Sequence, residues 1–138
     1  MESDVFDALA EPGRSAAPGD EAAESLGRLG LRTAALLRRE GRFDLALELL
    51  DEVVERFRDP DVETAAYAAA VGIHCDRGQP ATGLAVGRAL WETRPSVELG
   101  YALVRAYWER FEETCAADDR DDWLAFKDEL DALHDAAP

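Results

Sequence analysis

The side chains best suited to metal binding or nucleophilic catalysis are two histidines and two cysteines: His74, Cys75, Cys115 and His134. Zinc sites place their ligands at short spacings such as C-x2-C or H-E-x-x-H, and none of these spacings occurs here. Neighbouring residues on a helix point about 100° apart, so His74 is not aligned as a general base for the thiol of Cys75. The sequence therefore predicts no metal site, no cofactor and no catalytic residues, and we expect a protein that is not an enzyme.

Charged clusters are the other candidates for chemistry. The acidic run 118–122 lacks the spacing of a calcium-binding loop, and we expect it to be a solvated connection before the last helix. Arg38, Arg39 and Arg42 form one compact basic cluster. Two interpretations stay open for this cluster: a solvated face paired with nearby glutamates, or a contact for an anionic partner.

The elements that must position these side chains are helices. Apolar residues recur at helical spacing on both sides of Gly41, which predicts two amphipathic helices joined by a tight turn. Asp61 and Ser96 are the expected caps of later helices, and Gly83 and Gly87 lie one turn apart, which allows a close helix contact. No segment shows strand alternation. Helices are expected over about 20–40, 43–58, 61–76 and 80–93. A fifth helix is expected to start at Ser96 and to carry Phe111, and a last helix to carry Trp123 and Leu133.

The N-terminal 19 residues read as a short flexible segment, followed by a single helical domain over residues 20–138. Residues 11–19 are rich in Pro, Gly and Ala, as is typical of a linker. Residues 1–10 have two interpretations: a disordered tail, or a short motif whose Val5, Phe6 and Leu9 dock on a hydrophobic groove of this chain or of a partner.

Composition limits the partners. Thirty acidic and fifteen basic residues give a formal charge of −15, which repels nucleic acid and anionic membranes, so we expect neither as a partner. No run of about 18 apolar residues could span a bilayer, and the acidic start does not resemble a signal peptide, so we expect a cytoplasmic protein. Lys127 is the single lysine, a bias typical of salt-adapted proteins or of a high-GC genome.

The turn and breaker residues repeat along the chain. Gly41 and Gly78 are 37 residues apart, and Pro60 and Pro95 are 35 apart, close to the 34-residue period of tetratricopeptide repeats. Three segments match the spacing of that repeat: Ala46-x3-Leu50, Gly83-x3-Gly87 with Pro95, and Tyr101-x2-Val104-Arg105-x2-Trp108. Over about 26–134 the chain therefore resembles a divergent member of the tetratricopeptide repeat (TPR) family.

This resemblance implies an all-α fold: a right-handed stack of about three antiparallel hairpins, six helices in all, with a concave groove that binds a protein or peptide segment. Carried over by position, the groove suits an apolar segment with acidic flanks. The partner-binding residues would be Arg28, Leu31, Arg38, Arg39, Ala68, Gly72, Leu99, Ala102 and Arg110. The alternative is a structural protein that forms a homodimer through its last helix, with Trp123, Phe126 and Leu130 at the interface.

Overall fold

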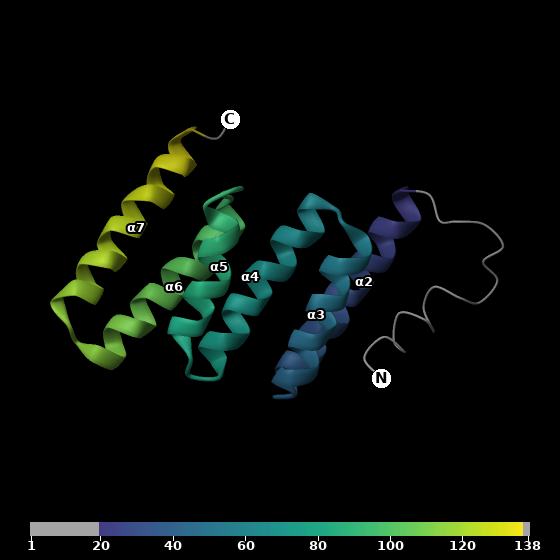
Figure 1. The fold of residues 1–138 in the computed structure, drawn as a ribbon, viewed down its shortest axis with the longest axis horizontal. Coiled ribbons are helices and arrows are strands. Elements are labelled where there is room, and N and C mark those ends of the chain that lie inside the picture. The colour runs from purple at the N-terminus through teal and green to yellow at the C-terminus, as the bar shows by residue number, and fades with distance from the viewer. Residues whose placement is uncertain (1–19, 137–138) are drawn as a thin grey trace. The chain divides into compact units, whose positions relative to one another are not determined.

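The computed structural model describes residues 20–136, and within that range the chain forms six α-helices and no strand (Figure 1). The expected all-helical fold is thereby confirmed. The predicted linker and the two interpretations of residues 1–10 lie outside the described residues. The helices are α2 (Asp20–Arg39), α3 (Phe43–Phe57), α4 (Pro60–Asp76), α5 (Pro80–Trp91), α6 (Val97–Thr114) and α7 (Ala117–Ala136).

The chain divides into two compact units, Met1–Ala66 and Tyr67–Pro138, and the boundary falls within α4. In the first unit α2 and α3 form a helical hairpin around small and branched side chains. Gly27 lies so close to the start of α4 that an added β-carbon would be 3.3 Å from both methyl groups of Val62. The buried apolar residues of this unit are Leu26, Ala34, Ala46, Leu49, Leu50, Val53, Val62 and Ala66.

Two glycine turns end α2 and α4 with the same hydrogen bonds. Gly41 has φ 77° and Gly78 has φ 75°, in the left-handed region that favours glycine. After α2, the N–H of Arg42 donates to the carbonyl of Leu37 and that of Gly41 to Arg38; the same two bonds recur 37 residues later, from Gln79 to His74 and from Gly78 to Cys75. This pattern is the Schellman motif, so the predicted helix ends are confirmed.

The second unit has a continuous apolar core shared by the end of α4 and by α5, α6 and α7. Gly87 sits where a β-carbon would be 2.5 Å from Cδ2 of Leu103 and 2.7 Å from Cγ2 of Val71. The close helix approach expected at the paired glycines is thus present. The buried members of this core are Val71, Cys75, Leu84, Leu90, Trp91, Leu99, Leu103, Ala106, Phe126 and Leu130.

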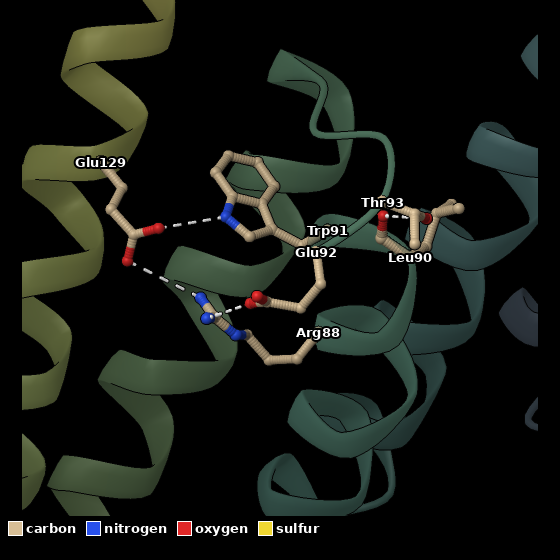
Figure 2. A network of polar contacts seen from close by, with 6 residues as sticks. All are labelled: Arg88, Leu90, Trp91, Glu92, Thr93 and Glu129. Carbon is tan, nitrogen blue, oxygen red and sulfur yellow. Dashed lines mark hydrogen bonds and ion pairs between the residues drawn. The ribbon is translucent and has the colours of Figure 1, made fainter.

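A polar network connects α5 with α7 at the edge of this core (Figure 2). The indole N–H of Trp91 donates to Oε1 of Glu129 over 3.2 Å, while the Trp91 ring packs 4.8 Å from the ring of Phe126. Arg88 forms ion pairs with Glu92 and, at 3.7 Å, with Oε2 of Glu129. Figure 2 also shows Thr93, whose hydroxyl donates to the carbonyl of Leu90 over 3.1 Å. Glu129 thereby satisfies a largely buried indole and a guanidinium together.

The capping residue predicted from the sequence is confirmed at the start of α6 and is wrong at the start of α4. Ser96 caps α6, because its hydroxyl accepts from the N–H of Leu99 over 3.2 Å. The expected cap Asp61 is wrong: it lies inside the first turn of α4, and Oδ1 of Asp59 accepts from the N–H groups of Asp61 and Val62 instead. Pro60 occupies the first helical position, where its missing N–H costs nothing, so the cap lies one residue before it.

The acidic run before the last helix is also a correction. Residues 118–122 do not form a loop; they make up the first turns of α7, and only Cys115 and Ala116 connect α6 to α7. Asp118 and Asp119 stand at the positive end of the helix dipole, which favours carboxylates there. Cys115 takes the left-handed conformation, φ 52°, that ends α6 without a glycine.

Candidate functional site

The outward face of α2 has an exposed apolar side chain among arginines. Leu36 is 52% exposed, the largest exposed fraction among the leucines that the structure describes. Beside it is a shallow depression of about 310 Å³, large enough for a few side chains of a bound segment. Its lining residues all come from this helix: Leu29, Arg32, Thr33, Ala35, Leu36 and Arg39.

Helical spacing explains why these residues share a face. Leu26 and Ala34 point into the first unit and are buried. Arg32, Ala35 and Arg39 follow one another at three- and four-residue steps on the opposite side, where all three are exposed. The depression therefore lies on the solvent side of an amphipathic helix whose apolar side is used for packing.

The electrostatics of this face are opposite to those of the whole protein. Five of the fifteen basic residues lie between Arg28 and Arg42, and Glu40 is the single acidic residue in that stretch. Arg42 is 3.8 Å from the Glu40 carboxylate, with both side chains exposed. Arg38 and Arg39 also stand in the last turn of α2, where the helix dipole favours positive charge. An anionic group approaching α2 thus meets a local excess of positive charge on an acidic protein.

The residues expected to bind a partner fall into two groups. On α2, Arg28 and Arg39 are exposed while Leu31 and Arg38 are half-buried, so four of the nine predicted residues belong to one helix. Arg39 also lines the depression. These four residues remain compatible with a contact surface.

The other five residues lie in the second unit and serve mainly in packing. Gly72 is buried and Leu99 is 0% exposed, so neither presents a surface to a partner. Ala68 and Ala102 are half-buried and pack against the apolar core. Arg110 is held by α7: its Nε lies 3.0 Å from Oδ1 of Asp119, and its Nη2 donates to Asp122 over 2.8 Å.

Sequence reasoning left out several of the residues that line the depression on α2, among them Leu29, Arg32 and Leu36. The signal was present, because Leu29 and Leu36 are seven residues apart and Arg32 is four residues after Arg28, which places each pair on one side of a helix. These positions were missed because the family pattern, rather than the arc opposite Leu26 and Ala34, was used to choose the exposed face.

The four residues considered for catalysis or metal binding are dispersed. Cys75 is buried in the core, Cys115 is exposed, and neither forms a disulfide bond. The Tyr101 hydroxyl lies 2.7 Å from Nε2 of His134. Within residues 20–136, no three His, Cys, Asp or Glu side chains gather as a metal-ligand set.

His74 combines partial burial with an unsatisfied nitrogen. Its Nδ1 is buried and has no hydrogen-bond partner within the described part of the chain. Burial, and then the nearby charge of Arg77, lower the pKa of His74 below its ordinary value. The neutral imidazole is thus the form that the folded protein favours.

The aromatic residues of α6 and α7 pack against one another. Phe126 and Leu130 are 1% and 4% exposed, so neither offers surface for a homodimer. Trp123 is half-buried beneath Trp108, with ring centroids 4.8 Å apart, and Lys127 lies over its ring. Only part of the proposed dimer interface is therefore exposed.

Comparisons with protein-family models, with curated proteins and with solved structures found no match for this chain. Among the described residues, no helix combines the length and apolar character needed to cross a bilayer.

Proposed function

We propose that this chain is a non-enzymatic protein-interaction module that binds an apolar segment of a partner protein carrying acidic residues. The observation that carries the proposal is the exposed Leu36 beside an Arg-lined depression on α2. An apolar side chain in this depression would bury surface, while carboxylates on either side would lie near Arg32 and Arg39. Opposite charges across such a contact set orientation and association rate more than affinity.

We further propose that the hairpins belong to a divergent TPR-like array. The support is the repetition of one turn structure: the Schellman hydrogen bonds and left-handed glycines at Gly41 and Gly78 recur 37 residues apart. Each turn joins two consecutive helices, as the turn of a tetratricopeptide repeat does. Such arrays bind partners on the concave surface that their stacked helices create.

Self-association through the last helix is the other function that the sequence suggests. The burial of Phe126 and Leu130 leaves Trp123 and Leu124 as the apolar side chains for such a contact. We therefore place the interaction on α2 and treat a homodimer as a competing outcome of the same experiments.

The test uses two fluorescein-labelled helical peptides that carry leucines at i, i+3 and i+4, one with flanking glutamates and one with flanking lysines. Fluorescence anisotropy should show binding of the acidic peptide to the full chain. Leu36→Ser should weaken binding about tenfold, a loss of about 1.4 kcal/mol, and Arg32→Glu with Arg39→Glu should weaken it further.

Matched controls come from α7, where Leu124 is 44% exposed and Arg120 is exposed. Leu124→Ser and Arg120→Glu should leave the affinity unchanged. Equal binding of the lysine peptide, or equal effects of the control variants, would refute the α2 site. A dimer seen by light scattering that is abolished by Leu124→Ser would favour self-association instead.

A further inference from the structure

The surface of α2 has a candidate ligand within its own chain. Residues 1–10 contain the large apolar residues Val5, Phe6 and Leu9 and three acidic residues, Glu2, Asp4 and Asp7, with no basic residue. This composition is the one proposed above for a partner segment. We propose that residues 1–10 bind the outward face of α2 and compete there with the partner, an inference that rests on the proposed function of that face.

The reach of the chain allows this contact. The nine residues Glu11–Gly19 separate the segment from Asp20, the first residue of α2. Fully extended, nine residues span about 30 Å. The 16 residues from Asp20 to Leu36 rise about 24 Å along a helix, so nine residues are long enough for Phe6 to reach the depression.

Charge favours the same placement. Between Glu24 and Glu40 the chain has no acidic residue, so residues 25–39 of α2 provide no carboxylate beside Arg32. Neither Arg32 nor Arg39 forms an ion pair with another described residue. Asp4 and Asp7 supply the missing negative charges while Phe6 and Leu9 cover Leu36.

Because residues 1–10 are covalently connected to α2, even a weak contact between them can compete with binding of the partner. A short flexible linker gives an effective concentration in the millimolar range, so a segment of millimolar affinity occupies α2 for about half of the time. A partner must displace it. Removing the contact is expected to raise the affinity for an acidic peptide about 2- to 5-fold. This factor equals one plus the effective concentration of the segment divided by its dissociation constant for α2.

The direct test is an NMR experiment on the full chain with ¹³C-labelled leucine methyl groups. We expect nuclear Overhauser contacts between the Phe6 ring and the methyl groups of Leu29 and Leu36. Phe6→Ser with Leu9→Ser should abolish them and move both leucine signals, and Arg32→Glu with Arg39→Glu should have the same effect. The matched control, Ala16→Ser with Ala17→Ser in the linker, should leave the signals in place.

Absence of these contacts, with Leu29 and Leu36 signals unchanged by Phe6→Ser and Leu9→Ser, would overturn the inference. Binding of the acidic peptide shows whether the internal ligand alone fails or the proposed partner site on α2 fails as well. If the peptide binds equally to the native chain and to the Phe6→Ser, Leu9→Ser variant, the α2 site stands and the internal ligand does not. If the contacts to Phe6 are present but the variant binds no peptide, the internal ligand stands and the partner site does not.

Discussion

Gly87 of α5 and Leu103 of α6 are in such close contact that a single methyl group does not fit between them. The β-carbon of an alanine at position 87 would be 2.5 Å from Cδ2 of Leu103. Real β-carbons do not approach a neighbour so closely, so the fully buried side chain of Leu103, or the helix that carries it, must shift to accept a larger residue.

This contact gives the first prediction, that Gly87→Ala destabilises the protein by about 1–3 kcal/mol through overpacking. The sign of the change in unfolding free energy is informative, because replacing glycine by alanine in an uncrowded helix stabilises the protein by about 1 kcal/mol. Urea denaturation followed by circular dichroism measures the difference. Ala89→Gly on the exposed side of the same helix isolates helix propensity and should cost no more than about 1 kcal/mol. A stabilised Gly87→Ala variant would show that the two helices are not in close contact.

The second prediction concerns the acceptor shared by Trp91 and Arg88. Glu129→Ala should lower the free energy of unfolding by about 1 kcal/mol, because the indole N–H loses its partner. Glu129→Gln keeps an oxygen for Trp91 and loses only the ion pair with Arg88, whose half-exposed position makes it worth little. Denaturation curves and the indole N–H chemical shift of Trp91 report the two effects separately. Equal losses in both variants would place the energy in the ion pair instead.

The third prediction compares the two candidate caps of α4. Asp59→Ala should cost about 1 kcal/mol, since the carboxylate of Asp59 accepts from two otherwise unpaired N–H groups. Asp61→Ala removes a carboxylate of the first turn but no capping bond, so its cost should be smaller. Thermal melts of both variants decide between the positions. The reverse order would restore the cap expected from the sequence.

The fourth prediction is a pH dependence from His74. Because the pKa of His74 is lowered by folding, the unfolded chain takes up this proton first, near the ordinary value of 6.5. The free energy of unfolding should therefore fall as pH decreases below 6.5, until the folded protein is protonated as well. His74→Gln should remove this component. Denaturation at pH 8, 6.5 and 5.5 measures it, and a variant that keeps the full slope would assign the effect to other groups.

Prediction from the sequence succeeded where a local rule decided the structure. Gly41 and Gly78 end helices because no other residue takes a positive φ so readily, and Ser96 caps α6 through its own hydroxyl. The same rules failed where two signals competed. Asp59 and Asp61 both fit a cap, and the position of Pro60 between them decided in favour of Asp59.

The binding surface was harder to predict, because exposure depends on packing between helices. Leu99 fits the family's groove pattern, yet it is fully buried in the core of the second unit. Arg110 fits as well, but carboxylates of α7 hold it. The sequence predicts a loop at these carboxylates, so it does not indicate that they lie beside α6. Leu36 became a candidate only when its 52% exposure was known.

The grouping of arginines on α2 also affects how the protein meets a charged solid. A quaternary-ammonium bead attracts the numerous carboxylates and repels the stretch from Arg28 to Arg42, so adsorbed molecules should turn α2 toward the liquid. A sulfonate bead repels the net charge of −15, so the contact that it can make with the protein is confined to α2. The choice of resin therefore decides whether an immobilised sample can capture anything through this helix.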